Sequence, residues 1–267
     1  MTPAIHPFTF ESYGVIVRLC SNLQDLLDDA QRTAKNSLLG NVRPVDNTEP
    51  DLQIELNRVG RQYFIYQDGE ELASGTSRRK LLKFFDSVIR ASVGEHAPEL
   101  VFLHGGVVGW KGKAIVLPAD SYKGKSTIVA ELVRCGATYL SDDFTIFDDE
   151  GLVHAFPRPL SMRTEDHRLY RITARSLGSA ETSESLPVGL VLFTEYAADA
   201  KWDPQLITPG NGVLKMIPYT LTFRLRPQSS LAVLNKVAAR AIIASSPRGN
   251  ATEFAPVILN FVDKNAN

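Results

Sequence analysis

The sequence predicts an α/β protein in which a core with a mixed sheet follows a smaller α+β segment. Two observations support this fold class. After residue 98, short apolar runs typical of buried strands alternate with stretches of helical period, and before it, half-buried strand patterns accompany two amphipathic helical stretches. Of the 267 residues, 44% are hydrophobic, which suits a globular protein with a substantial core and excludes a disordered or fibrous chain.

A soft boundary near Pro98 divides the chain into residues 1–97 and residues 98–267. In the first part, residue 21 is the expected cap of one helix and Ser77 the cap of a second, whose basic start, residues 78–80, is expected to face solvent. Strands of a small antiparallel sheet are expected at residues 13–20, 52–56 and 63–66. The alternative is that this first part extends the sheet of the second.

In the second part, the apolar pattern predicts a series of strands and helices. Strands are expected at residues 100–106, 114–117, 138–141, 144–147, 152–156 and 189–193, and helices at 127–135 and from about 231, the latter capped by Ser229 or Ser230. Residues 176–187 and 208–212 are rich in Ser, Thr, Gly or Pro and are expected to form mobile loops.

The most informative stretch is ADSYKGKS, residues 119–126, between a predicted strand and a predicted helix. A strand that turns tightly into a helix directs several backbone NH groups and the positive end of the helix toward one point. Lys125 adds a full positive charge there, and Ser126 adds a hydroxyl that suits Mg2+. These groups indicate a polyphosphate-binding loop, with a polar turn before a helix as the alternative. Ala119 replaces the usual first glycine, and Tyr122 stands where a small residue is common.

Two further polar features come from neighbouring predicted strands. Asp142 and Asp143 end the strand that follows the loop's helix, where carboxylates can hold Mg2+ or accept a proton. The alternative is a simple turn. His104 lies near the end of the preceding strand, before a glycine-rich bend, and adjacent strand ends are where α/β folds gather their sites. Further on, Arg163 is favoured over Arg158 as a phosphate-neutralising residue, with a solvated surface loop as the alternative.

These residues resemble the bacterial HPr kinase/phosphorylase and HPr kinase-like family, whose core combines a phosphate-binding loop with a phosphoenolpyruvate-carboxykinase-like arrangement. The similarity covers about residues 100 to 147. The motifs that carry it are His104-Gly105, Asp120-Ser121, Gly124-Lys125-Ser126, Glu131-Leu132-Val133 with Gly136, and Asp142-Asp143.

The resemblance implies an ATP-dependent kinase that transfers a phosphoryl group to a serine-type hydroxyl of a protein, peptide or small molecule. It implies that Lys125 and the loop amides bind the phosphates, that Ser126 helps to hold Mg2+, and that Asp142 accepts the hydroxyl proton. Phosphorylase activity is not implied, because its later signature is not recognised. The expected nucleotide-binding residues are Asp120, Ser121, Tyr122, Lys123, Gly124, Lys125, Ser126 and Thr127; the expected metal ligands are Ser126, Asp142 and Asp143; and the expected catalytic residues are Asp142, His104, Lys125 and Arg163.

Two other functions stay open: a nucleotide-binding regulatory module and an inactive kinase-like scaffold. A net charge of −1 gives no general attraction to nucleic acid or to an anionic membrane, and no apolar run has the length of a membrane helix. Cys20 and Cys135 are expected to be reduced core thiols. The expected location is the cytoplasm, and the expected partners are ATP, Mg2+ and the hydroxyl acceptor. A homo-oligomer is compatible with the sequence.

Overall fold

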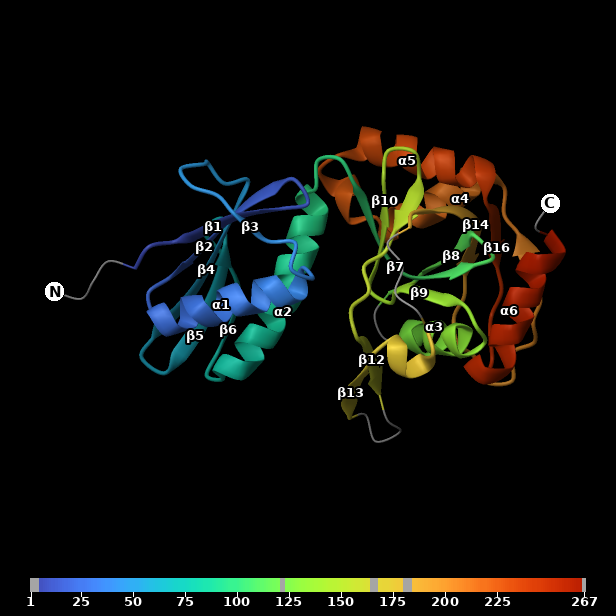
Figure 1. Cartoon of the computed structure of the whole chain (residues 1–267), viewed down its shortest axis with the longest axis horizontal. Coiled ribbons are helices and arrows are strands. Elements are labelled where there is room, and N and C mark those ends of the chain that lie inside the picture. Colours follow the sequence, from blue (N-terminus) through green and yellow to red (C-terminus); the bar gives the residue numbers. More distant parts are fainter. Residues whose placement is uncertain (1–4, 121–122, 164–167, 180–183, 266–267) are drawn as a thin grey trace. The chain divides into compact units, whose positions relative to one another are not determined.

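The chain folds into two units, residues 1–99 and residues 100–267, each with its own β-sheet (Figure 1). The structure is a computed structural model that describes residues 5–120, 123–163, 168–179 and 184–265. Helices and mixed sheets alternate along the chain, so the fold belongs to the mixed α/β class. No helix of these described ranges has both the length and the apolar character needed to cross a membrane.

The first unit is built on a six-stranded sheet with the order β3-β1-β2-β4-β5-β6. Its strands are β1 (Phe8–Ser12), β2 (Val15–Ser21), β3 (Arg43–Pro44), β4 (Leu52–Val59), β5 (Gln62–Gln67) and β6 (Glu70–Gly75). The expectation of a purely antiparallel sheet was wrong at one pairing, because β2 and β4 run parallel. The chain between them forms a helix, the usual crossover between parallel strands.

Two helices, α1 (Gln24–Ser37) and α2 (Arg78–His96), pack on this sheet and on each other. Alternate residues of β4, from Leu52 to Leu56, are fully buried, as a strand covered on one face requires. Ser77 caps α2 as expected and accepts a hydrogen bond from the Lys80 amide at 3.4 Å. The expected Ser21 cap of α1 was wrong, because Leu23 directly precedes the helix, and the Ser21 hydroxyl accepts from the Leu23 amide at 3.2 Å and donates to the Leu56 carbonyl of β4.

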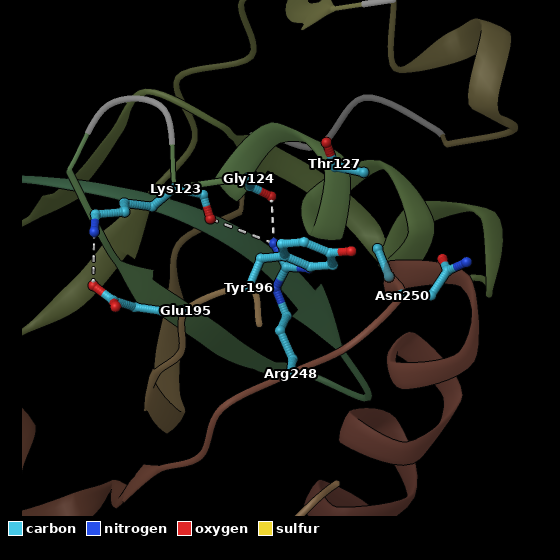
Figure 2. A pocket seen from close by; sticks show the side chains of 8 residues that line it. Lys123, Gly124, Thr127, Glu195, Tyr196, Arg248 and Asn250 are labelled. Carbon is cyan, nitrogen blue, oxygen red and sulfur yellow. Dashed lines mark hydrogen bonds and ion pairs between the residues drawn. The ribbon is translucent and has the colours of Figure 1, made fainter. Parts of the chain in front are cut away.

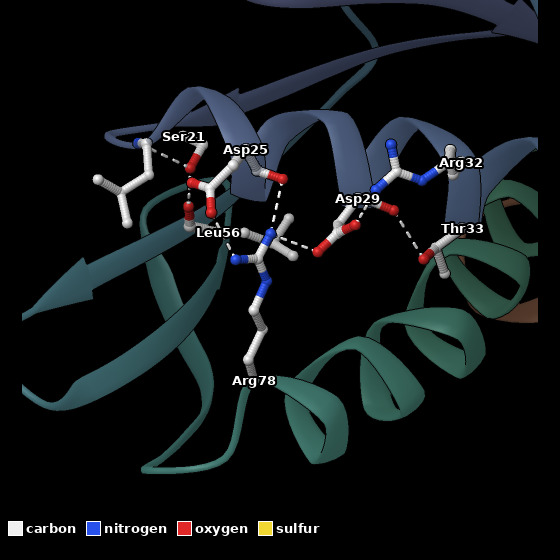
Figure 3. Close-up of polar contacts among 8 residues, drawn as sticks. Ser21, Asp25, Asp29, Arg32, Thr33, Leu56 and Arg78 are labelled. Atoms are coloured by element: carbon white, nitrogen blue, oxygen red, sulfur yellow. Dashed lines mark hydrogen bonds and ion pairs between the residues drawn. The ribbon is translucent and has the colours of Figure 1, made fainter.

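Arg78 joins the two helices of the first unit (Figure 3). Its Nη1 donates to Asp25 Oδ2 at 2.6 Å, its Nη2 donates to the Asp25 carbonyl at 2.7 Å, and it forms an ion pair with Asp29. The hydrogen bond from Arg78 holds the pKa of the Asp25 carboxyl below its usual range. The expectation that residues 78–80 merely face solvent was therefore wrong for Arg78.

The second unit contains an eight-stranded mixed sheet, in which β11-β10-β7-β8-β14-β16-β15 follow one another and β9 also pairs with β7. Its strands are β7 (Val101–Trp110), β8 (Lys113–Pro118), β9 (Thr138–Ser141), β10 (Phe144–Phe147), β11 (Leu152–His154), β14 (Leu186–Phe193), β15 (Gln205–Leu206) and β16 (Ile242–Ser245). A separate hairpin consists of β12 (Leu160–Arg163) and β13 (Leu169–Ile172).

Helices cover both faces of this sheet. Successive apolar residues of β8 point to opposite faces and pack in two separate buried clusters. Ile115 and Leu117 pack in one buried cluster with residues of α3 (Lys125–Arg134) and α6 (Ala251–Asn265). Ala114 and Val116 pack in the other, with residues of α4 (Pro209–Met216) and α5 (Pro227–Arg240). Short 3-10 helices lie at Arg175–Leu177, Ile217–Tyr219 and Leu221–Arg224. A sheet buried on both faces needs apolar side chains on both, as β8 has.

Four expectations about the second unit were wrong. The bend expected at Gly105 and Gly106 is absent, because β7 continues through both glycines to Trp110. Residues 208–212 are not a flexible loop, because α4 begins at Pro209, whose fixed φ suits the first turn of a helix. Helix α5 begins at Pro227 rather than at a serine cap, and Ser230 donates instead to Thr222 Oγ1 at 3.1 Å. Cys135 is exposed at the end of α3, not buried in the core. Of the expected loop 176–187, residues 180–183 lie outside the described ranges.

Three central strands, β8, β14 and β16, are parallel, so their carboxyl ends lie at one edge of the sheet. The segments that follow them begin at Ala119, Thr194 and Ser246. Ligands of open α/β sheets bind at such an edge, outside the carboxyl ends of the strands. The topology therefore brings the predicted phosphate loop together with two segments that are distant in sequence.

Candidate functional site

The predicted phosphate loop joins β8 to α3. Gly124 is the residue before the first turn of α3, and its φ of 76° lies in the left-handed region that favours glycine. The helix begins at Lys125, two residues before the expected start at Thr127. The first NH groups of a helix have no partner within it and carry its positive partial charge. The local geometry is therefore that of an anion-binding helix end.

The side chain of Lys125 extends toward the start of the loop and toward β7. Its side chain is only 9% exposed, and its Nζ lies 2.8 Å from His104 Nε2 and donates to the Ala119 carbonyl at 3.3 Å. Burial lowers the pKa of Lys125 to about 8, although Asp143, Asp142 and Asp120 act in the opposite direction. The ammonium ion is thus poorly solvated and available for an anionic ligand.

Gly106 leaves room for this path of Lys125. A Cβ at position 106 would lie 2.6 Å from Val129 Cγ2 and 3.2 Å from Lys125 Cγ. The lysine stem therefore crosses β7 where that strand carries no side chain. The glycine explains how a lysine at the start of α3 reaches His104 on the neighbouring strand.

Ser126 points to the acidic pair. Its hydroxyl donates to Asp142 Oδ2 at 2.7 Å, so the loop and the end of β9 meet at one point. Asp142 is only 7% exposed. Burial raises the pKa of the Asp142 carboxyl, and the Asp143 charge adds to this, while the Ser126 and Tyr139 hydroxyls and Lys125 oppose it. A carboxylate with a raised pKa is a stronger base than an ordinary aspartate.

The buried Tyr139 contacts the Asp142 carboxylate through its hydroxyl. Its ring is 1% exposed, and its hydroxyl oxygen lies 2.7 Å from the Arg158 carbonyl and 3.1 Å from Asp142 Oδ1. The hydroxyl has a single proton to donate, and these two acceptors compete for it. Asp142 receives the longer contact, so the Tyr139 hydroxyl only partly offsets the burial that raises the pKa of the Asp142 carboxyl.

Backbone hydrogen bonds hold the acidic turn in place. The Asp143 and Phe144 amides donate to Ser141 Oγ at 3.1 and 3.2 Å, and the Gly105 amide donates to the Asp143 carbonyl. Asp143 lies close enough to affect the pKa of both Lys125 and Asp142. The turn is thus fixed relative to β7, the strand that carries His104.

The donor set fits a magnesium ion that shares its ligands with a phosphate. Among the residues that the structure describes, there is no group of three or more His, Cys, Asp or Glu side chains that could hold a metal ion. Mg2+ bound with nucleotide phosphates usually has one or two protein carboxylates and keeps waters for its other positions. Ser126 and Asp142 offer a hydroxyl and a carboxylate in direct contact, and Asp143 is the next residue.

The structure brings together four of the predicted residues: His104, Lys125, Ser126 and Asp142. Asp120, Lys123, Gly124 and Thr127 line cavities next to the same loop. Ser121 and Tyr122 lie outside the described residues, and Arg163 ends β12 with its side chain outside the described part. The roles expected for these three residues, and for the other predicted site residues, stay predictions.

Arg248, which no sequence motif indicated, binds two backbone carbonyls of the loop. Its side chain is 2% exposed, and its Nη2 donates to the Gly124 carbonyl at 2.8 Å and to the Lys123 carbonyl at 3.5 Å. Burial lowers the pKa of its guanidinium, which stays charged because arginine is so basic. Its position after β16, at the carboxyl end of a parallel strand, is the signal that could have identified it.

Replacing Gly124 by alanine is expected to disturb this support. The alanine would be strained at a φ of 76°, and its Cβ would lie 2.5 Å from Arg248 Nη2. We expect a loss of about 1–3 kcal/mol in unfolding free energy and a marked loss of nucleotide affinity. Urea unfolding and calorimetry measure the two effects. Gly112→Ala is the control, because it has a similar φ of 78° but nothing within 4 Å; equal affinity in both variants would contradict the role of the Arg248 contact.

Two cavities flank the loop. One, of about 520 Å3, is lined by Lys123, Gly124, Thr127, Glu195, Tyr196, Arg248, Asn250 and Ala251 (Figure 2). The other, of about 560 Å3, includes Asp120, Lys123, Thr194, Lys215 and Tyr219 in its lining. Both have the size usual for small-molecule sites. The loop thus has room for a ligand larger than a phosphate ion.

No family model matches the sequence, and no curated protein matches it. Among solved structures, the Hpr(Ser) kinase/phosphatase from Coxiella burnetii is similar with a TM-score of 0.36 and 10% identity, over 62% of this chain and 90% of that chain. A likeness this weak supports no functional argument, so function must be argued from the geometry of the site.

Proposed function

We propose that this protein is an ATP-dependent kinase that transfers the γ-phosphoryl group to a serine-type hydroxyl. The observation that carries the proposal is the 2.7 Å contact between Ser126 Oγ and Asp142 Oδ2, next to a buried Lys125. A phosphate-binding helix end, a buried cation and a basic carboxylate at one point are the groups that phosphoryl transfer requires. A polar turn with no ligand would not require Lys125, Ser126 and Asp142 to lie together.

Each group has a role that follows from its position. Lys125 and the amides at the start of α3 bind the phosphate oxygens, and Ser126, Asp142 and Asp143 would hold Mg2+ or its waters, which neutralises phosphate charge. Asp142 takes the proton of the acceptor hydroxyl as its oxygen forms the new bond to the γ-phosphorus. The bond from that phosphorus to the β–γ bridging oxygen breaks, and ADP leaves. His104 fixes the position of the Lys125 ammonium group.

The test is incubation of the full chain with Mg2+ and γ-labelled ATP, together with an extract fractionated into proteins, peptides and small molecules. We expect label on a hydroxyl of one fraction, as an acid-stable phosphate ester. Binding of ATP without labelled acceptor or free phosphate would favour the regulatory module, and absence of ATP binding would refute the proposal. The acceptor class, protein, peptide or small molecule, is the direct outcome of the experiment.

Nucleotide affinity is expected to depend on pH through Lys125. Its pKa of about 8 means that the side chain of the free protein is charged below this pH and neutral above it. Because the charged form binds phosphate, we expect Mg2+-nucleotide affinity to be about tenfold lower at pH 9 than at pH 7.5. Calorimetry at saturating Mg2+ with a non-hydrolysable ATP analogue measures it. A constant affinity between these pH values would contradict the assignment.

A further inference from the structure

The 520 Å3 cavity contains an exposed aromatic ring on a rigid support (Figure 2). Tyr196 is 60% exposed, and one side of its ring meets the Arg248 guanidinium, 5.9 Å from the ring centroid. Arg248 is itself held by the Gly124 carbonyl, and backbone hydrogen bonds join residues 195 and 197 to Arg248. An exposed ring held against a buried arginine suits the stacking of a flat ligand.

The direction of a bound triphosphate follows from α3. Consecutive residues of a helix point about 100° apart, and here Ser126 points to Asp142 while the exposed Thr127 lines the cavity of Tyr196. The transferred phosphoryl group must lie at Asp142, where the proton acceptor is. A phosphate chain that continues from Asp142 along the start of α3 would pass Thr127, and the rest of the nucleotide would enter the 520 Å3 cavity.

The polar groups of the cavity suit a nucleoside. Asn250 Oδ1 accepts the Thr252 amide at 3.1 Å and caps α6, so its amide NH2 is the group left to donate to a ligand. Glu195 is 70% exposed in its side chain, and its contact with Lys123 is a long 3.3 Å ion pair. Carboxylates commonly bind ribose hydroxyls. The negative charge of Glu195 disfavours phosphate at that position, which again places the phosphates at the helix end.

We propose that this cavity is the nucleoside subsite of the kinase, in which the purine ring stacks on Tyr196 and the ribose lies near Glu195. The inference rests on the proposed phosphotransfer function and adds the residues that recognise the nucleoside. Tyr196 acts by ring contact, and Arg248 acts as a positioning residue that holds both the ring and the loop.

The experiment is calorimetric titration of the full chain with a non-hydrolysable Mg2+-ATP analogue and, separately, with Mg2+-tripolyphosphate. We expect Tyr196→Ala to weaken binding of the analogue about tenfold or more and to leave tripolyphosphate binding unchanged. Tyr196→Phe keeps the ring and is expected to bind as the wild type does. Tyr63→Ala is the matched control, because Tyr63 also stacks on an arginine, Arg58 at 5.5 Å, but in the first unit.

The outcomes separate this inference from the proposed function. Unchanged analogue affinity in Tyr196→Ala, or equal affinity of the wild type for analogue and tripolyphosphate, would overturn the nucleoside subsite and leave the phosphate site standing. Equal losses for both ligands would show that Tyr196 only supports the loop, which also overturns it. A wild type that binds neither ligand would refute the proposed function and, with it, the subsite.

Discussion

Replacing Lys125 by methionine is expected to reduce Mg2+-ATP affinity and phosphotransfer by at least about 100-fold each, and to make the protein more stable. Function is lost because the buried ammonium group is the main fixed charge for the phosphates. Stability rises because burial disfavours this charge, as the pKa of about 8 shows. We expect a gain of about 1–3 kcal/mol in unfolding free energy at pH 7, measured by urea unfolding.

The pH dependence of the gain in unfolding free energy tests whether the buried charge of Lys125 causes it. Below pH 8, Lys125 is charged in both the folded and the unfolded protein, and the folded form bears the full cost of burial. As pH rises from about 8 to the ordinary value of 10.5, the folded form loses its proton first and the cost disappears. The difference in stability between wild type and Lys125→Met should therefore shrink over this range.

Lys123→Met is the control for charge removal. Lys123 lies on the same loop, but its side chain is 47% exposed and paired with Glu195 at 3.3 Å. We expect no gain in stability and a much smaller loss of affinity, since exposed charges are well screened. Equal effects of the two substitutions on affinity would mean that the burial of Lys125 has no special importance.

Replacing Asp142 by asparagine is expected to lower kcat by about 100- to 10,000-fold and to leave nucleotide affinity within about threefold. Asparagine has the same shape, so its carbonyl can still accept the Ser126 hydroxyl and its NH2 can donate to the Tyr139 oxygen. Ser126 and Asp143 remain to hold Mg2+ or its waters, so what the variant mainly lacks is the capacity to accept the proton of the attacking hydroxyl. Single-turnover rates with labelled ATP, measured beside binding constants, separate the two quantities.

Asp148→Asn is the control for a general effect of losing a carboxylate. Asp148 belongs to the turn between β10 and β11 and pairs with His154 at 2.9 Å, away from the phosphate loop. We expect its turnover to match that of the wild type. An unchanged kcat in Asp142→Asn would instead assign the proton acceptor to another group.

The parts of the site that the sequence predicted are those set by local pattern. The strand, loop and helix around Lys125, and the strand that ends in Asp142, follow from apolar periodicity and from residues that suit turns. Their convergence also followed from the rule that neighbouring strand ends share an edge. The mixed α/β class was predicted for the same reason, because it depends on the order of local elements.

The parts that the sequence did not reveal depend on contacts between distant residues. Arg248 is 124 residues from Gly124, and no spacing rule connects a loop after the last strand to a helix cap so far away. Tyr139 looked like an ordinary strand residue, because only the fold shows that its hydroxyl lies under Asp142. Similarly, the helix start at Pro209 was mistaken for a loop because glycine-rich sequence usually disfavours a helix.

Gly106 has a consequence for variation among related chains. No ligand needs to touch this position, and a mid-strand glycine usually weakens a sheet, but a Cβ at position 106 would lie only 2.6 Å from Val129 Cγ2. A methyl group there would also press on the Lys125 stem, 3.2 Å from its Cγ, where that stem passes toward His104. Homologues that keep both Val129 and Lys125 should therefore keep the glycine, and a chain with a larger residue at this position should also have a smaller side chain at position 129.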